Sequence, residues 1–360
     1  MRFLKRRKSF NKSILYKYAL LPVIILLEVF VLSGCKKTGA RIVLTTDFTE
    51  DVVFKIEDSL CTKSEVLVYL VNTENIYDDV FGEKIWQVPY KDGNVESQYK
   101  ESILARLAQI KAMNLYAKEI GVTLSDTEEK LISQAAEEYY SSLTGQEIKA
   151  LAVSVDSIEN MYREYAVANK LYEHITESVN PEISDDEART VSVRSILIKT
   201  YSMDADGNKI LYSQDMKDAA MKRAYEIKAR IDAGEEFEIL AADYNEDEKA
   251  MYSFARGVMP EEIEEAAFNM SEGEVSDVIQ TEYGYHIIKC ITNFDKEQTD
   301  ANKEKIVSKR KQETFTESYD TYISKLTSNI NSELWESISY ERMDEIKTTT
   351  FFAVYDKYFK

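Results

Sequence analysis

Histidine and cysteine are scarce in this chain of 360 residues, which has two histidines and three cysteines. Because protein metal sites are usually built from clustered histidine, cysteine and carboxylate ligands, two histidines make a histidine-based metal site an unpromising interpretation. Cys61 and Cys290 lie far apart in the sequence and do not form the pattern of a disulfide framework. We therefore expect both of them to be buried free thiols.

Glycine and proline are also infrequent, with 11 and 4 residues respectively, so the chain has little linker and is mostly regular structure. Its length is sufficient for two compact domains. Basic side chains are outnumbered by acidic ones, 45 against 64, and the net charge is −19. A surface with this charge repels phosphate groups, which excludes nucleic acid as a partner and disfavours anionic lipid headgroups.

The basic side chains are unusually dense at the start of the chain. Residues 2–17 contain seven lysines and arginines, and the segment from Ala19 to Leu32 is apolar except for Glu28. A basic segment followed by a short apolar one is typical of a secretion signal. The apolar run of about 14 residues is shorter than the ~20 that a membrane-spanning helix needs.

This segment ends in Leu32-Ser33-Gly34-Cys35, which resembles the lipobox of bacterial lipoproteins. The resemblance implies that residues 1–34 are removed and that the Cys35 thiol carries a diacylglyceryl group. Residues 35–47 would then be a tether on the extracytoplasmic face of the bacterial plasma membrane, where several acyl chains hold a protein firmly. The alternative is an uncleaved signal anchor with an incidental cysteine.

Residues 48–188 have mainly helical patterns after a short strand. Apolar residues alternate over residues 52–56 and then recur at helical spacing in three stretches between residues 96 and 171. Ser125 and Glu128 form the sequence pattern of a capping box at the start of one helix. We therefore predict a helical domain here.

Residues 189–293 have a different, mixed pattern. Two expected strands are hinged at Gly284, and Asp206-Gly207 indicates a turn in a polar insert. The expected elements are a β-branched strand over residues 191–198, helices over 214–233 and 263–268, and strands over 278–280 and 285–291. The segment is thus a compact α/β module.

Residues 294–360 return to a helical pattern whose apolar face extends to Trp335. Because a lone helix cannot bury its apolar face, we expect this segment to pack on residues 48–188. The fold class is then α+β, with the mixed module inserted into a mainly helical domain.

Seven short stretches of the mixed module share their order and spacing with one known family. They are Val193–Lys199, Phe237–Ala241, Tyr244–Asp247, Phe254–Met259, Glu265–Phe268, Gly273–Ser276 and Thr281–Lys289. Together they resemble the parvulin (PpiC) family of peptidyl-prolyl isomerases, in which helices surround a small antiparallel sheet. The flanking helices resemble the chaperone part of PrsA- and SurA-type secretion foldases.

The resemblance implies isomerase activity without a cofactor. Cis and trans Xaa-Pro amides are separated by a barrier of ~18–20 kcal/mol, and no bond needs to break. Such a site binds proline in an apolar socket and favours the twisted amide. By the family pattern, Asp247 lies beside the substrate amide. His286 and Thr281 form the hydrogen-bonded floor of the same site. The implied socket consists of Met251, Phe254, Met259 and Ile263, with Phe268 beneath them.

Three departures from the family pattern bear on turnover. Ser195 stands where the family usually has a second histidine, and Ile263 replaces a usual aromatic residue. The loop between Asp247 and Phe254 is shorter by about five residues than is usual in the family. A hydroxyl both donates and accepts, so we count Ser195 as a candidate catalytic residue that completes a hydrogen-bond chain to His286.

Three functions remain open. The leading hypothesis is a membrane-anchored isomerase and foldase that acts on unfolded or extended proline-containing secreted polypeptides; self-association as a homodimer is left open. The second is a non-catalytic peptide-binding chaperone with a degenerate parvulin site, and the third is a structural envelope lipoprotein. If neither residue has a functional role, His286 is a core residue whose hydrogen bonds are satisfied and Asp247 is a solvent-exposed carboxylate in a loop.

Overall fold

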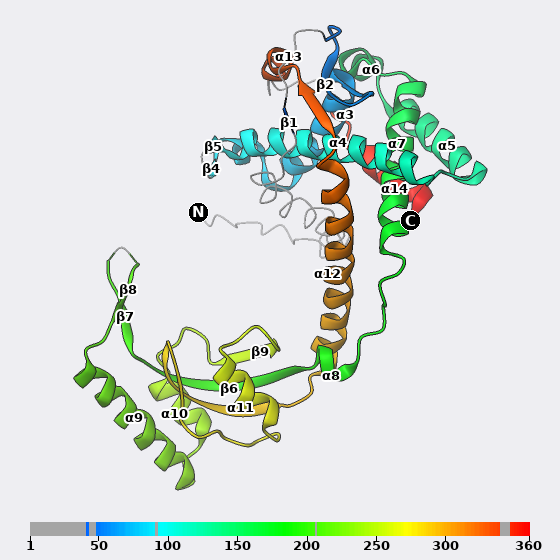
Figure 1. The fold of residues 1–360 in the computed structure, drawn as a ribbon. Helices are drawn as coiled ribbons and strands as arrows, with labels where there is room; N and C mark the ends of the chain where they lie inside the picture. Colours follow the sequence, from blue (N-terminus) through cyan, green and yellow to red (C-terminus); the bar gives the residue numbers. More distant parts are fainter. Residues whose placement is uncertain (1–40, 43–47, 91–92, 206, 339–345) are drawn as a thin grey trace, which may run out of the picture. The chain divides into compact units, whose positions relative to one another are not determined.

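The structure is a computed structural model that describes residues 41–42, 48–90, 93–205, 207–338 and 346–360. The predicted signal segment, Cys35 and nearly all of the predicted tether lie outside these residues. The chain forms two compact units, one ending at Glu177 and resuming at Thr314, and the other spanning Ser178–Glu313 (Figure 1). Among the described helices, none combines the length and apolar character that crossing a bilayer requires.

The first unit is mainly helical, and side-chain caps fix where its helices begin. Thr62 with Glu65 and Ser125 with Glu128 form capping boxes, in which each side chain bonds the other residue's backbone N–H. The capping box predicted at Ser125 is therefore confirmed. The helices are α3 (Lys63–Phe81), α4 (Val95–Ile120), α5 (Asp126–Ser142), α6 (Gly145–Leu151) and α7 (Val155–Thr176), with the short elements η1 (Glu83–Gln87), β4 (Pro89–Tyr90) and β5 (Gly93–Asn94) between α3 and α4.

A small sheet in this unit corrects one expectation. The predicted helical pattern up to Trp335 is wrong between Ile323 and Ser332, because β12 (Thr327–Ile330) is a strand that pairs antiparallel with β2 (Val52–Ile56). Backbone hydrogen bonds to a distant strand outweigh the local helical period here. The sheet order is β1-β12-β2-β3, with β1 at Arg41–Ile42 and β3 at Ser59–Thr62; α13 (Ser332–Ser337) follows β12.

The C-terminal helix α14 (Phe351–Phe359) lies in the segment predicted to be helical and fills the centre of this unit, a position that the sequence patterns did not indicate. The Phe351 ring stacks on Tyr162, with centroids 4.5 Å apart, and meets Tyr139 edge-on at 5.2 Å. Tyr162 also donates its hydroxyl hydrogen to the Phe351 carbonyl at 2.7 Å. The last residues of the chain thereby complete the core formed by the N-terminal helices.

The second unit is built on a four-stranded antiparallel sheet in the order β10-β11-β6-β9. Strands β6 (Thr190–Lys199), β9 (Met251–Ala255), β10 (Ile279–Thr281) and β11 (Gly284–Thr292) form it, close to the predicted bounds. The helices are α8 (Asp185–Ala188), α9 (Gln214–Asp232), α10 (Phe237–Tyr244), α11 (Glu261–Asn269) and α12 (Lys296–Ile323), of which α12 continues beyond Glu313; strands β7 (Tyr201–Met203) and β8 (Lys209–Leu211) form a separate hairpin (Figure 1).

Side chains that alternate along the central strands give the sheet two distinct faces. Ile196 and Ile287 belong to one cluster with residues of α9 and α10. Val193 and Ile288 belong to another, with residues of α11. His286 lies opposite Leu197 in the register and so belongs to the α11 face.

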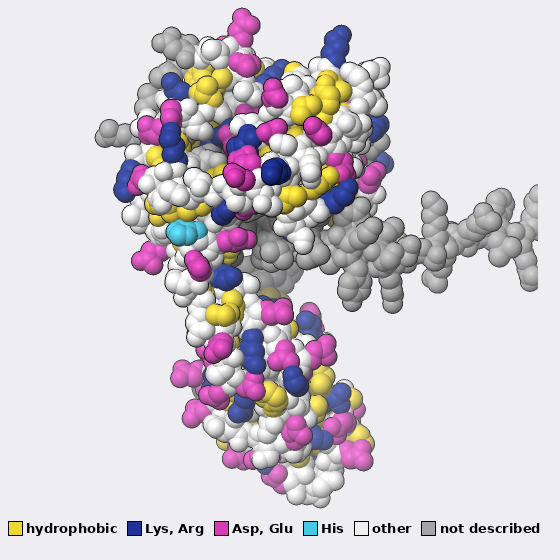
Figure 2. Space-filling view, turned by 90° about the vertical axis from the view of Figure 1, so that its right-hand side faces the viewer, with side chains coloured by type: hydrophobic (Ala, Val, Ile, Leu, Met, Phe, Trp, Pro, Cys, Tyr) yellow, Lys and Arg dark blue, Asp and Glu magenta, His cyan; other side chains and the backbone are white. Residues whose placement is uncertain are grey.

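Both remaining cysteines are buried and free, as predicted. Cys61 lies in β3 of the first unit and Cys290 in β11 of the second. Acidic side chains are spread over the face shown in Figure 2 with lysines and arginines between them, in keeping with the net charge of −19.

Gly284 begins β11 and determines how closely this strand approaches β6. Its φ angle is +143°, and a Cβ atom at this position would come 2.1 Å from the Ile198 carbonyl oxygen. No side chain fits at this distance, and residues other than glycine rarely adopt this backbone conformation. Glycine here therefore allows the close approach of β11 to β6.

We predict that Gly284→Ala lowers the free energy of unfolding of this unit by at least about 3 kcal/mol, from clash and strain together. Chemical denaturation followed by circular dichroism measures the loss. Gly273→Ala is the matched control, since its φ is also positive, +83°, but no atom lies within 4 Å of the added Cβ. Equal losses in the two variants would contradict the close approach.

Candidate active site

His286 lies in the middle of β11, where its imidazole is buried on the α11 face. Its Nε2 atom is 2.9 Å from the hydroxyl oxygen of Thr281, the last residue of β10. The Tyr283 backbone N–H donates to the same hydroxyl oxygen at 3.1 Å. The turn between β10 and β11 thus positions the imidazole and its partner together.

The imidazole of His286 is neutral at physiological pH. Burial lowers its pKa to about 4, although the negative charges of Asp247 and Glu262 act in the opposite direction. A neutral imidazole can donate from one ring nitrogen and accept at the other. His286 can therefore orient a ligand by hydrogen bonding, but at pH 7 it supplies no positive charge.

Asp247 lies in the loop after α10, and Asn245 attaches this loop to β6. The Asn245 side-chain oxygen accepts from the backbone N–H groups of Leu197 at 2.9 Å and of Asp247 at 3.2 Å. Its amide group donates to the Asp247 carbonyl at 3.2 Å. The backbone of Asp247 is therefore held against the central strand of the sheet.

Tyr252 fixes the Asp247 carboxylate, a role that our sequence analysis missed. The Tyr252 hydroxyl donates to Asp247 Oδ2, and the Glu248 backbone N–H donates to Oδ1 at 2.8 Å. Burial and the charge of Asp247 raise the pKa of Tyr252 well above its usual value, so the phenol stays protonated. The available sequence signal was the two-residue spacing from Tyr252 to Phe254, which puts both side chains on the same face of β9.

Four of the five predicted socket residues come together on the α11 face. Phe254, Ile263 and Phe268 are buried in one cluster against which Met259 packs, and the two phenylalanine rings meet edge-on with centroids 6.2 Å apart. Met251 is not in this cluster. It lies opposite Arg194, its side chain is 45% exposed, and strand alternation puts it on the other face of β9.

Glu264 holds the loop that carries Met259 and was also missed from the sequence. Its carboxylate accepts from the backbone N–H groups of Gly257 at 3.0 Å, Val258 at 2.8 Å and Met259 at 2.9 Å. The loop before α11 is thereby fixed to that helix. An acidic residue in the first turn of a helix was the only sequence signal for this role.

Ser195 is buried in β6 opposite Ile288, and its backbone N–H donates to the Ala250 carbonyl at 2.8 Å. Within the described part of the chain, its hydroxyl makes no hydrogen bond to His286, whose partner is Thr281. No cluster of three or more histidine, cysteine or acidic side chains in that same part is arranged to hold a metal ion. The groups available for chemistry are thus one neutral imidazole, one fixed carboxylate and an apolar cluster.

Comparison with known proteins identifies the class of this module. Residues 196–292 match the family described as rotamase, PPIC-type PPIASE domain. The second unit is therefore a parvulin-type peptidyl-prolyl isomerase domain, as the sequence resemblance predicted. The antiparallel sheet with surrounding helices agrees with the predicted α+β fold class.

Longer matches extend the similarity beyond this domain. Foldase protein PrsA of Caldanaerobacter subterraneus is 27% identical over 249 residues, which are 66% of this chain and 73% of that protein. Foldase protein PrsA of Bacillus subtilis is 35% identical over 159 residues, 39% of this chain and 54% of the relative. Over these stretches the chain is similar to parvulin-type PrsA foldases, and it spans only about half the length of the second relative.

A crystal structure of PrsA from Bacillus cereus covers 74% of this chain and 97% of its own, with 20% sequence identity. The TM-score is 0.36, which is too low for an element-by-element comparison.

We predict that the imidazole resonances of His286 titrate with a midpoint near pH 4 in NMR spectra of the folded chain. The unfolded chain takes up this proton near pH 6.5, so folding stability falls by about 3 kcal/mol as the pH drops from 6.5 to 4. His174→Asn removes the exposed second imidazole and so assigns the signals. A midpoint near 6.5 would contradict a buried, neutral imidazole.

Proposed function

We propose that the second unit accelerates cis–trans isomerisation of Xaa-Pro bonds in unfolded polypeptides. The observation that carries this proposal is the common placement of three features on the α11 face. These are the buried His286–Thr281 pair, the fixed carboxylate of Asp247, and the apolar cluster containing Phe254 and Phe268. Such a set suits a reaction that needs binding and electrostatics but no bond cleavage.

The proposed mechanism follows from the electronic structure of the amide. A planar Xaa-Pro amide carries partial negative charge on its oxygen because of resonance, and water stabilises this charge. An apolar socket removes that water, and the anionic Asp247 beside the carbonyl disfavours the charge-separated planar form further. The twisted transition state has lost the resonance, so it is bound more tightly than either ground state.

His286 has a positioning role in this scheme. Because its imidazole is neutral and held by Thr281, one hydrogen-bonding ring atom keeps a fixed direction toward the ligand. Tyr252 has the same function for Asp247, whose carboxylate would otherwise rotate freely. Both contacts limit the loss of conformational entropy when the client binds.

We further propose that this foldase acts outside the cytoplasm on secreted proteins, tethered by lipid on Cys35. The supporting features are the basic and apolar segments before Cys35 and the lipobox-like Leu32–Cys35, all outside the described residues. The relatives are foldase proteins by name. The extended, proline-containing chains that such a protein meets would be its clients.

The second candidate function is peptide binding without turnover. Two observations favour it, since Ser195 makes no hydrogen bond to His286 in the described part of the chain and Met251 lies outside the apolar cluster. Neither affects the apolar cluster itself, so a client could still be held. Measured turnover decides between the two functions.

The first test uses a soluble version that begins at Lys36 and so keeps every described residue. We predict that this protein speeds the exchange between the cis and trans forms of the peptide Ala-Ala-Pro-Phe in NMR exchange spectra. In the Asp247→Asn variant we expect kcat/KM to fall about tenfold, which corresponds to a loss of about 1.4 kcal/mol in transition-state stabilisation. Asp243→Asn is the matched control, because it removes an exposed carboxylate on nearby α10. No acceleration, with suppression of client aggregation retained, would eliminate the enzyme in favour of the chaperone.

The second test is Ser195→His, which places an imidazole on β6 on the same face as His286. We predict a kcat/KM higher by about two- to tenfold, since a second ring can extend the hydrogen-bond chain that Ser195 leaves incomplete. Thermal unfolding of the variant checks that the larger side chain is accommodated. A folded variant with unchanged or lower turnover would show that the missing histidine does not limit this site.

A further inference from the structure

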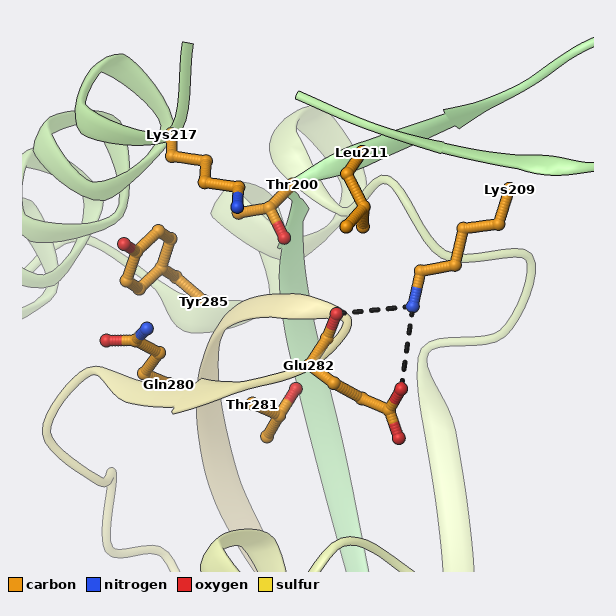
Figure 3. A pocket seen from close by; sticks show the side chains of 8 residues that line it. All are labelled: Thr200, Lys209, Leu211, Lys217, Gln280, Thr281, Glu282 and Tyr285. Carbon is orange, nitrogen blue, oxygen red and sulfur yellow. Dashed lines mark hydrogen bonds and ion pairs between the residues drawn. The ribbon is translucent and has the colours of Figure 1, made fainter. Parts of the chain in front are cut away.

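A cavity of about 540 Å³ opens between the β7–β8 hairpin, the start of α9 and the end of β10 (Figure 3). Thr281 lines this cavity and also holds His286 on the α11 face. The cavity therefore adjoins the floor of the proposed isomerase site. It involves none of the residues implied for the proline socket, so it is a separate place for a ligand.

Two lysines and one acidic residue, Glu282, line the cavity, and the two lysines are held differently. Lys209 is fixed in place: its Nζ lies 3.3 Å from the Glu282 carbonyl oxygen, 3.7 Å from the Glu282 carboxylate and 4.6 Å from the Tyr283 ring centroid. Lys217, in the first turn of α9, points toward the cavity in Figure 3. Its ammonium group has no ion pair or hydrogen bond within the residues that the structure describes.

Lys217 is half-buried, and its side chain reaches into the cavity from α9. A carboxylate entering the cavity could form an ion pair with its ammonium group. Polar side chains of Thr200 and Gln280 also line the cavity and can hydrogen-bond an anion. An acidic group is therefore the ligand that this lining fits best.

The hairpin beside the cavity has the features of a surface for extended chains. Met203, Ile210 and Leu211 are all more than half exposed on it. Its two strands form a sheet of their own, so their outer backbone edges have no strand partner among the described residues. A polypeptide in extended conformation can pair with such an edge while its side chains enter neighbouring pockets.

We propose that this cavity is a specificity subsite that takes an aspartate or glutamate side chain of the client, with Lys217 as its counter-ion. The proposal rests on the proposed function, because the client is the same proline-containing chain. The negative charge of the whole chain gives such a subsite a role in selecting clients. A chain with a net charge of −19 repels acidic segments at long range, so a local cation decides which of them can reach the neighbouring site.

The test compares two peptides that differ only in charge, one with glutamates on both sides of a central Ala-Pro and one with glutamines. Fluorescence anisotropy gives their affinities for the chain from Lys36 onward, and NMR exchange gives their turnover. We expect the glutamate peptide to bind about two- to fivefold more tightly at low salt, as for a partly exposed ion pair. The preference should shrink in high salt.

Lys217→Met should abolish the preference, and Lys217→Glu should reverse it. Lys222→Met is the matched control, since it removes the same charge from the same helix at a side chain that is 79% exposed and outside the cavity. This control should keep the preference intact. Loss of the preference in Lys222→Met as well would assign it to the general field of the protein and overturn the subsite.

The outcomes separate this proposal from the isomerase. Equal binding of the two peptides by the unaltered chain, with turnover of both, overturns the subsite and leaves the enzyme standing. A charge preference that depends on Lys217, without turnover of either peptide, supports the subsite and overturns the enzyme.

Discussion

A buried imidazole must have a hydrogen-bond partner, and the second unit is arranged around this requirement. His286 is largely buried on the α11 face, and the Thr281 hydroxyl at 2.9 Å is its partner. Gly284, two residues before His286, lets β11 approach β6, because no side chain would fit against the Ile198 carbonyl. The strand that carries the buried imidazole therefore also carries the glycine that its packing on β6 requires.

The carboxylate of Asp247 is controlled in a comparable way by residues around a shortened loop. Asn245 attaches the backbone of this loop to β6, and Tyr252 holds the carboxylate from the neighbouring strand. The phenol comes from β9, which begins only four residues after Asp247. The short loop therefore brings Tyr252 close to Asp247, where it keeps the charge in a fixed position beside the apolar cluster.

Local signals predicted much of this fold, and distant pairings account for what they missed. The capping box at Ser125 and the strands around Gly284 could be predicted because each depends on neighbouring residues. Strand β12 could not, since it forms by pairing with β2, some 270 residues earlier in the chain. For the same reason the central position of Phe351 was not apparent, because its ring packs between helices distant in sequence.

In the candidate site, too, the sequence indicated the position of some residues and not of others. His286, Thr281 and Phe254 lie on one face by strand alternation, and Phe268 reaches the same face from α11. Met251 is three residues before Phe254 in β9, so alternation puts their side chains on opposite faces, which the family spacing did not take into account. The Tyr252–Asp247 contact likewise depends on how the loop closes.

The most direct test of the central claim is NMR mapping with a neutral Xaa-Pro peptide on the isotope-labelled chain. If the α11 face binds proline, shift changes should centre on Tyr252, Phe254 and His286 and leave the α10 face of the sheet unchanged. Changes confined to the first unit or to the α10 face would contradict the placement of the site, and with it the isomerase mechanism.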